Sequence, residues 1–364
     1  MSKSTNKSIK ISRSRGLFIS IIALLCAACQ PRIATSFWKI GTPADSVRSG
    51  YAVLYEGTKM RHCYPITEWT ADPAVDTYHQ LHHHGVAVES EWMAYRIYFD
   101  KKQTIDPYCK RKPQLELSQS HWYPNDSLLA LGYGDDILRV SGTVGVGSVK
   151  YWNGTKMVHI EPVAERSQRI VTQTRNQATI EVAVKGWQVP LNNSQLNDFS
   201  QLSTLNSQLL DLSVQYTMLA GHRDLRCDVY LSDTLSGLCT GVQTIPAKGG
   251  SDTSVVYLPN GVLLASWGTD WPVNDSAKYA KETVGLAVFI PYPYAGDIVH
   301  DKQNNLCLLK TINSQTSLNS QLSTLNYSCH FYLTVCGATK ENHPVATNAT
   351  EWLIYLRKWA KGLK

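Results

Sequence analysis

The fold is indicated most directly by the stretch Trp92-Met-Ala-Tyr-Arg-Ile-Tyr-Phe-Asp100, in which two sets of side chains alternate along the sequence. Successive side chains of a β-strand point to opposite faces of a sheet, so this stretch predicts a strand with two different faces. One face would carry Glu91, Met93, Tyr95, Ile97 and Phe99. The other would bring a ring, a guanidinium, a phenol and a carboxylate into one row, from Trp92, Ala94, Arg96, Tyr98 and Asp100.

Similar short runs, rich in β-branched and aromatic residues, recur between Gly, Pro, Asn and Asp. They predict further strands at 114–117, 144–151, 179–184, 214–219, 255–266, 284–291 and 331–335. We interpret 142–147 as a glycine-broken strand. One helix is expected over residues 349–361, because its aromatic and apolar residues recur at helical spacing, at Trp352, Tyr355, Leu356 and Trp359. The whole pattern predicts an all-β fold, a large antiparallel β-sandwich with a C-terminal helix.

The N-terminus has the layout of a bacterial export signal. Residues 1–28 carry five Lys or Arg and no acidic residue, and 16–25 form a short apolar run. The following Cys26-Ala-Ala-Cys29 resembles a lipobox, which predicts a lipoprotein signal peptide over 1–28 and lipidation of Cys29. Ordinary cleavage after a small residue, giving a free periplasmic protein, is the alternative. We therefore expect a lipid-anchored protein of the bacterial cell envelope that faces the periplasm, with the outer membrane as one candidate location.

Charge and motifs argue against several classes of function. Removal of the five cations in residues 1–28 lowers the formal net charge from +6 to +1, and no basic stripe remains that would suit a nucleic acid. The sequence has no P-loop, GxGxxG fingerprint or GxSxG elbow, so neither a nucleotide nor a nucleotide cofactor is expected. Tyr and Trp supply 29 of the 35 aromatic residues, which suits a wet binding surface.

The rest of the chain is expected to form one domain. A tether at 29–44 would precede a single β-sandwich domain at 45–364. Ser200–Asn206 recurs identically as Ser320–Asn326, within Asn/Ser/Gln/Leu tracts at about 192–212 and 313–327. We interpret both tracts as loops inserted between strands, because the entropy cost of a longer loop grows slowly. The pairs Cys227/Cys239 and Cys307/Cys329 could form disulfides outside the cytosol, or these thiols could be small buried hydrophobes.

The run His82-His83-His84, followed by Glu89 and Glu91, is the best candidate site in the sequence. In an extended segment His82 and His84 would point the same way and could hold a divalent metal with one of the glutamates. Alternatively, one histidine acts as a general base and the others position a substrate. The spacing is not a specific metal signature, so no metal and no cofactor is predicted.

Other candidates share a composition typical of sugar binding. An Arg can clamp a carboxylate bidentately, a Trp can stack on a sugar, and a Tyr or His nearby can transfer a proton. The candidate catalytic residues are His82, His84, Glu89, Glu91, Tyr95, Arg96, Tyr98, His222 and Arg223. The candidate substrate-binding residues are Trp92, Asp100, Asp270 and Trp271.

The run Glu89-Ser-Glu91, with 94–100 and then Ile105-Asp-Pro-Tyr-Cys-Lys110, resembles domain-of-unknown-function family 4861. Partial matches continue at 145–148, 220–223, 238–241 and 274–288, so the likeness covers roughly 45–310 and the last strands. The resemblance implies a sandwich akin to the supersandwich of sugar-acting proteins. It also implies a secreted or lipidated protein of Gram-negative bacteria associated with uronate-rich polysaccharides, notably pectin. It carries over no catalytic assignment.

Three functions are therefore weighed. The leading hypothesis is an enzyme acting on uronate-containing oligosaccharides as a lyase or a hydrolase, in which Glu89, Glu91, Asp100 and Asp270 would supply the hydrolytic pair. The second is a non-catalytic glycan-binding lipoprotein, and the third is a structural surface protein whose histidines bind metal. Convergence of His84, Glu91, Arg96 and His222 in one concave pocket would favour the enzyme, whereas scatter over different faces would count strongly against it.

Overall fold

The computed structural model describes residues 33–36, 38–41, 62–71, 81–120, 123–189, 208–245, 252–314, 322 and 325–363. The chain divides into two compact units, 1–31 and 32–364, and the description concerns the second. The predicted signal peptide and Cys29 lie outside the described residues, as does most of both Asn/Ser/Gln/Leu tracts. Among the residues described, no helix is long and apolar enough to cross a membrane.

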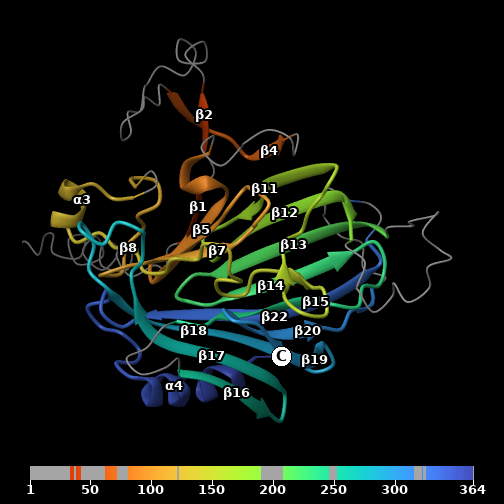
Figure 1. The fold of residues 1–364 in the computed structure, drawn as a ribbon. Helices are drawn as coiled ribbons and strands as arrows, with labels where there is room; N and C mark the ends of the chain where they lie inside the picture. The colour runs from red at the N-terminus through yellow and green to blue at the C-terminus, as the bar shows by residue number, and fades with distance from the viewer. Residues whose placement is uncertain are drawn as a thin grey trace, which may run out of the picture. The chain divides into compact units, whose positions relative to one another are not determined.

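The largest element is a 10-stranded antiparallel sheet (Figure 1). Its main path runs, in spatial order, through β16 (Asp252–Leu258), β17 (Gly261–Asp270), β18 (Glu282–Pro291), β22 (Tyr327–Gly337), β14 (Leu225–Leu231), β13 (Leu209–Leu219), β12 (Gln177–Gln188), β11 (Glu165–Gln173) and β4 (Glu68–Ala71). The short β21 (Ile312–Asn313) pairs with β22 beside this path.

Two five-stranded sheets and a two-stranded ribbon complete the described strands. One sheet has the order β1 (Ile33–Ser36), β5 (Ala87–Ser90), β6 (Met93–Ile97), β7 (Ile105–Cys109) and β8 (Asp135–Asp136). The other has the order β10 (Met157–Val158), β9 (Lys150–Trp152), β15 (Leu238–Gln243), β20 (Asn304–Leu309) and β19 (Ala295–His300). The ribbon pairs β2 (Trp38–Gly41) with β3 (His62–Pro65). Because β1 and β2 fall inside 29–44, this part of the predicted tether is paired strand.

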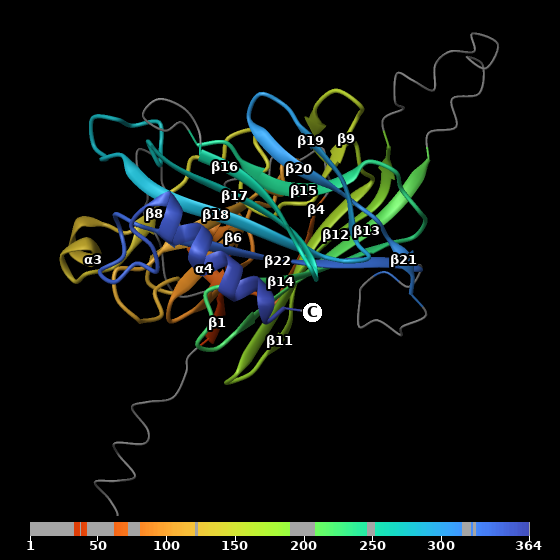
Figure 2. The same cartoon turned by 90° about the horizontal axis from the view of Figure 1, so that it is seen from below.

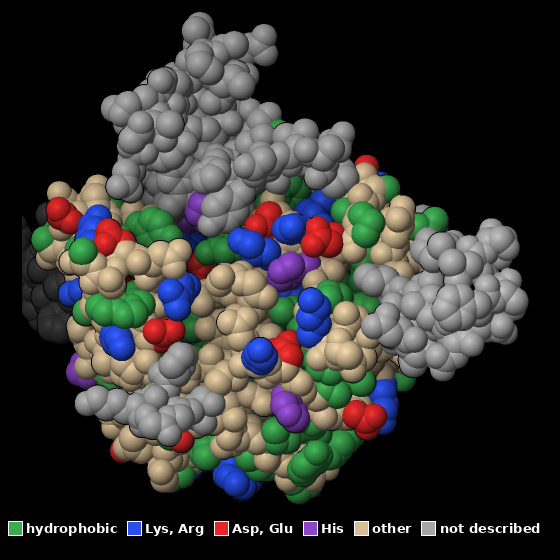
Figure 3. All heavy atoms as spheres, in the orientation of Figure 1, with side chains coloured by type: hydrophobic (Ala, Val, Ile, Leu, Met, Phe, Trp, Pro, Cys, Tyr) green, Lys and Arg blue, Asp and Glu red, His purple; other side chains and the backbone are tan. Residues whose placement is uncertain are grey.

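One large apolar core joins the sheets. It combines alternate residues of the large sheet, such as Val182 and Val214, with Met93 and Ile97 of β6 and Tyr151 of β9. The predicted all-β antiparallel sandwich is therefore confirmed, because the sheets bury their apolar faces against one another. On the face that Figure 3 shows, Lys and Arg side chains lie interspersed with Asp and Glu in the described part of the surface.

The predicted C-terminal helix is also confirmed. Helix α4 (Ala349–Lys361) begins after Asn348, whose side chain accepts a hydrogen bond from the Glu351 backbone N–H at 3.0 Å. Such a cap satisfies a helix N–H that has no partner within the helix. The buried face of α4 covers the outer side of β17 and β18, with Trp352 and Leu356 packed in a second apolar cluster (Figure 2). The only other α-helix in the described residues is the short α3 (Asp126–Ala130).

Several predicted strands end elsewhere or do not form. Residues 114–117 form no strand, because the N–H groups of Glu116 and Leu117 bind the Glu89 carboxylate instead of a neighbouring strand. Residues 255–266 are two strands, β16 and β17, joined by a turn at Pro259 and Asn260.

The glycine-rich run 142–147 is a succession of turns rather than a broken strand. Gly145 and Gly147 have φ of 59° and 70°, a region that favours glycine and departs from strand geometry. Of the predicted strand 144–151, only the last two residues lie in β9.

The cysteines whose side chains the structure describes behave as small hydrophobes. Six are buried and unpaired with one another: Cys109, Cys227, Cys239, Cys307, Cys329 and Cys336. Neither predicted disulfide forms, and burial raises the thiol pKa of Cys239 and Cys329 above the usual range. A thiol with a raised pKa holds little reactive thiolate, so these cysteines serve packing.

Candidate functional site

Strand β6 organises the candidate residues, and its two faces follow the predicted alternation. Tyr95 and its apolar neighbours on one face enter the main core, where the Tyr95 hydroxyl donates to the Arg223 carbonyl at 2.6 Å. On the opposite face Ala94 packs with Tyr108 and Leu117 in a smaller cluster. The alternation of β6 therefore sends Tyr95 and Arg96 into different environments.

Arg96 lies at the centre of a buried polar network. Its Nη2 donates to Asp106 Oδ2 at 2.5 Å and to an oxygen of Asp136, and all three side chains are at most 4% exposed. The Tyr98 hydroxyl donates to the same Asp106 oxygen at 2.6 Å. Asp106 is cross-strand partner of Arg96 in the β6–β7 register, and β8 supplies Asp136.

The two carboxyl groups have altered acidity. Burial raises the pKa of Asp106 and, more strongly, that of Asp136, while the Arg96 charge opposes both shifts. Carboxyl groups in such surroundings hold protons more readily than exposed ones. Asp106 can therefore take up a proton that the Tyr98 hydroxyl gives away.

Tyr98 and Asp136 line a cavity of about 240 Å³, which we call the Tyr98 cavity. Its other lining residues are Lys102, Tyr123, Leu138, Arg139, Val140, Ser141, Pro272, Val273 and Asn274. Since one water needs roughly 10–15 Å³ in this measure, the cavity has room for about 16–24 water-sized groups. That room suits a ligand of one or two sugar rings.

Two cations on the rim of the Tyr98 cavity form long ion pairs with aspartates. Arg139 approaches Asp270 at 3.6 Å and donates to Asn274 Oδ1 at 3.2 Å, and 43% of its side chain is exposed. Lys102 Nζ lies 3.5 Å from Asp100. Long, partly exposed pairs of this kind are weak, so a carboxylate ligand can compete for either cation.

The histidine run departs from the extended conformation on which the H-x-H interpretation rested. His82–His84 form a 3₁₀ turn, and His83 and His84 have φ of 56° and 58°. All three are buried; His83 Nε2 donates to the Leu117 carbonyl at 2.8 Å, and the His84 ring meets the Tyr98 ring edge-on at 5.4 Å. The described residues contain no group of three His, Cys, Asp or Glu side chains that could hold a metal ion.

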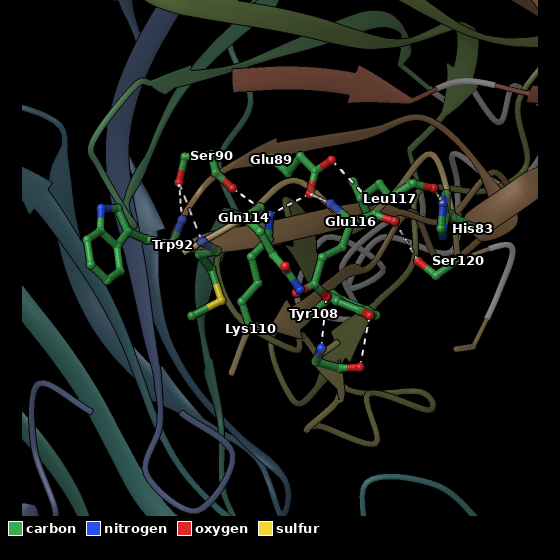
Figure 4. Close-up of polar contacts among 12 residues, drawn as sticks. His83, Glu89, Ser90, Trp92, Tyr108, Lys110, Gln114, Glu116, Leu117 and Ser120 are labelled. Atoms are coloured by element: carbon green, nitrogen blue, oxygen red, sulfur yellow. Dashed lines mark hydrogen bonds and ion pairs between the residues drawn. The ribbon is translucent and has the colours of Figure 1, made fainter. Parts of the chain in front are cut away.

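Glu89 is part of a second buried network (Figure 4). Its carboxylate accepts from Lys110 Nζ at 2.5 Å and from the N–H groups of Glu116 and Leu117 at 2.9 and 3.1 Å. Lys110 also donates to the carbonyls of Ser90 and Gln114. With three hydrogen bonds at each end, the Lys110–Glu89 bond included, this ion pair anchors the segment after β7 against β5.

A second cavity, of about 90 Å³, lies at the other end of β6 and is here called the Trp92 cavity. Its lining residues are Glu91, Trp92, Lys110, Arg111, Lys112, Pro113, Glu341 and His343. Two predicted residues stand beside it: Arg223 pairs bidentately with Glu341 at 3.0 and 3.1 Å, and His222 follows Gly221, whose N–H donates to Glu91 at 3.2 Å. His222 itself contacts Asp224 at 3.2 Å.

The four side chains weighed for one pocket are divided between these two places. His84 and Arg96 lie behind the Tyr98 cavity, in contact with its wall, whereas Glu91 and His222 lie at the Trp92 cavity. The single four-residue site is therefore not formed in the structure. By the criterion stated for these four side chains, this division counts against an enzyme that uses all four. Of the candidate catalytic residues, Tyr98 lines the Tyr98 cavity and Glu91 lines the Trp92 cavity.

The predicted substrate-binding residues divide in the same way. Trp92 lines its own cavity, while Asp100 and Asp270 face the cations of the Tyr98 cavity. Trp271 directly precedes three residues of that cavity wall, Pro272, Val273 and Asn274, and Lys281 Nζ lies 5.6 Å from the centre of the Trp271 ring.

Sequence reasoning missed Asp106, Asp136, Arg139 and Lys110 as parts of the sites. Asp106 and Lys110 belong to the stretch that carried the family resemblance, and Asp136 follows another acid just before the apolar pair Ile137-Leu138. A carboxylate within a buried apolar run was the available signal, because such a group needs a partner.

Fold and sites together define an all-β sandwich protein with two cavities at opposite ends of one strand, each bordered by charged side chains. The family model described as domain of unknown function (DUF4861) matches residues 46–364, so the chain belongs to that family. No curated protein matches the chain.

Proposed function

We propose that this protein is an envelope lipoprotein that cleaves uronate-containing, pectin-like oligosaccharides by elimination in the Tyr98 cavity. The observation that carries the proposal is the Tyr98 hydroxyl, which donates to buried Asp106 at 2.6 Å in the wall of a cavity that also presents Arg139 and Lys102. A base, a proton acceptor behind it and two cations thus surround one cavity. That combination is what removal of a proton next to a carboxylate requires.

The proposed steps use only these groups. Arg139 binds the uronate carboxylate and so acidifies the hydrogen on C5. The Tyr98 oxygen takes that proton while its own proton passes to Asp106. The C4–O bond breaks, a C4–C5 double bond forms, and the leaving oxygen takes a proton from the Lys102 ammonium. Arg96 holds Asp106 in position and is a positioning residue.

Elimination fits the geometry better than hydrolysis. Of the four carboxylates considered for a hydrolytic pair, Glu89 is fully engaged by Lys110 and backbone N–H groups, and Glu91 lies at the Trp92 cavity. Asp100 and Asp270 remain near the Tyr98 cavity, where each faces a cation. The Tyr98 cavity therefore suits an acid/base pair of two carboxyl groups less well than it suits a phenol base with a carboxylate behind it.

The test is incubation of purified protein with pectic oligosaccharides. We expect new ultraviolet absorbance from the C4–C5 double bond, and a loss of about 10²–10⁴-fold in rate for Tyr98→Phe, since that is the usual contribution of a general base. Tyr257→Phe, at a side chain 68% exposed on β16, is the matched control. New reducing ends without this absorbance would instead indicate hydrolysis. The absence of both signals over a broad panel of oligosaccharides would refute the proposal that the protein is an enzyme.

A non-catalytic glycan-binding lipoprotein is the second candidate, favoured by the exposed ring of Trp92. It predicts binding that depends on Trp92 and Trp271, without turnover. The lipid anchor is tested separately by Cys29→Ser, which should move the protein from the membrane to the soluble fraction. Cys26→Ser should leave it in the membrane fraction, and equal behaviour of both variants would argue against Cys29 as the anchor.

A further inference from the structure

We infer that the Trp92 cavity is a second, non-catalytic binding site, which takes a single acidic sugar residue. Its existence does not require turnover in the Tyr98 cavity, although the sugar class rests on the proposed function. The cavity combines a flat exposed ring with two cations that have no acidic partner among the described residues, over a base held by hydrogen bonds, and each of these features follows from named contacts.

The backbone of Trp92 is held in place, and the side chain of Trp92 remains accessible. Its backbone N–H donates to Ser90 Oγ at 3.1 Å, and that hydroxyl in turn donates to the His222 carbonyl at 2.5 Å. The side chain is 39% exposed, unlike the buried residues that follow it on β6. In Figure 4 the ring lies at the margin of the polar network and points away from it. An exposed indole on a held backbone offers apolar area for a sugar ring at little cost in entropy, because a Trp side chain has only two χ angles.

The charge at the cavity is positive. Lys110, Arg111 and Lys112 line it together with Glu91 and Glu341, which gives a formal charge of +1. Glu341 pairs with Arg223, whereas Glu91 accepts the neutral Gly221 N–H and keeps its charge. Arg111 and Lys112 are exposed, and neither has a carboxylate partner among the described residues, although Lys112 Nζ donates to the Leu131 carbonyl at 2.8 Å. A guanidinium and an ammonium without acidic partners favour an anionic ligand.

The base of the cavity is rigid. Lys110 is 3% exposed, and its ammonium donates to Glu89, to the Ser90 carbonyl and to the Gln114 carbonyl at 2.5–2.7 Å. All three donors of this ammonium are used, so the segment that carries Arg111 and Lys112 is fixed before any ligand binds. Fixed groups lose less entropy on binding than mobile ones.

Size and position separate this site from the Tyr98 cavity. A volume of 90 Å³ has room for about six to nine water-sized groups, which suits part of one sugar ring and its carboxylate. Trp92 and Tyr98 are six residues apart along an extended strand, which places them about 20 Å from one another. The two cavities therefore bind separate residues of a long chain, or separate molecules.

The experiment is calorimetric titration of the full protein carrying Tyr98→Phe with a galacturonate trisaccharide. We expect two binding sites per protein chain. The site in the Trp92 cavity should be lost both in Trp92→Ala and in Arg111→Glu/Lys112→Glu, while the site in the Tyr98 cavity remains. Lys358→Glu, an exposed cation of α4, is the matched control and should keep both sites. A neutral galactose trisaccharide should not occupy the Trp92 cavity, and salt should weaken the acidic ligand there.

Unchanged stoichiometry and affinity in Arg111→Glu/Lys112→Glu would overturn the inference, as would equal binding of the neutral trisaccharide. Far-ultraviolet circular dichroism shows that each variant is folded before it is titrated. The two proposals fail separately. Trp92-dependent binding without any turnover refutes only the enzyme, and turnover without a Trp92-dependent site refutes only this inference.

Discussion

Replacement of Arg96 by Met tests the buried network behind the Tyr98 cavity. Arg96 is 1% exposed and is the shared cation of Asp106 and Asp136. Met keeps an unbranched apolar stem but leaves two buried carboxyl groups without their guanidinium. Breaking a buried ion pair by removing one partner costs about 3–5 kcal/mol, because the remaining charge has lost its solvent and its partner. We expect the free energy of unfolding in urea to fall by that amount.

The pH dependence of the variant has a defined sign. Burial already raises the pKa of Asp106 and Asp136 in the folded state, and loss of Arg96 removes the influence that opposes this shift. Above the folded pKa the carboxylates are charged and destabilise the fold, and below it they are protonated. The deficit of Arg96→Met relative to the wild type should therefore shrink as pH falls from 7 towards 5. Arg96→Met/Asp136→Asn should recover part of the loss at pH 7.

Arg226→Met is the matched control for this prediction. Arg226 also binds a carboxylate, Asp228, at 2.7 Å, but 44% of its side chain is exposed. Exposed pairs contribute about 0–1 kcal/mol, so this variant should lose little stability. Equal losses in the two variants, or an Arg96→Met deficit that does not change with pH, would refute the account of the network.

Further predictions follow from buried groups elsewhere. Burial lowers the pKa of Lys150 to about 7, so between pH 7 and 10 the unfolded chain binds more protons at this group than the folded chain does. The free energy of unfolding should therefore rise by about 2 kcal/mol from pH 7 to pH 9 because of this group. Urea titrations at the two pH values should show that Lys150→Met abolishes this rise. Trp352→Ala should lower the free energy of unfolding in urea by about 3–5 kcal/mol, because the side chain is buried. Ile354→Ala, at an exposed position of the same helix, should lower it by less than about 1 kcal/mol. Similar losses in the two variants would contradict the packing of α4. A Cβ on Gly85 would lie 2.0 Å from the Ile97 carbonyl oxygen, so Gly85→Ala should fail to fold or lose most of its melting transition, and an unchanged melting temperature would contradict the turn.

Much of the fold follows from local periodicity. Residues 349–361 form the helix that their spacing predicts, and the faces of β6 follow the alternation of 92–100. The strand predictions are wrong where the backbone does not form the regular hydrogen bonds between neighbouring strands. Residues 114–117 bind the side chain of Glu89, and 142–147 bend through glycines with positive φ. Neither arrangement leaves a periodic signal in the sequence.

The candidate site was predicted only in part. Arg96 and Tyr98 share a polar face as expected, but their partners Asp106 and Asp136 come from β7 and β8, and that pairing depends on strand register. The histidines, which the sequence favoured most, are buried in a tight turn. The spacing of residues in the sequence predicts to which face of a strand each side chain points. It carries no information on which residue of the neighbouring strand lies opposite.

By itself the sequence determined the strand-rich composition, the two faces of β6, the C-terminal helix and the family. These features depend on the order of apolar and polar residues within single segments, where geometry repeats every two or 3.6 residues. Only the tertiary structure decided that Arg96 is a buried partner of two carboxyl groups and that Trp92 and Tyr98 belong to separate cavities. Those relations arise because the register of β5 to β8 brings together side chains 10 to 40 positions apart, whose solvation, charge and acidity each depend on the others.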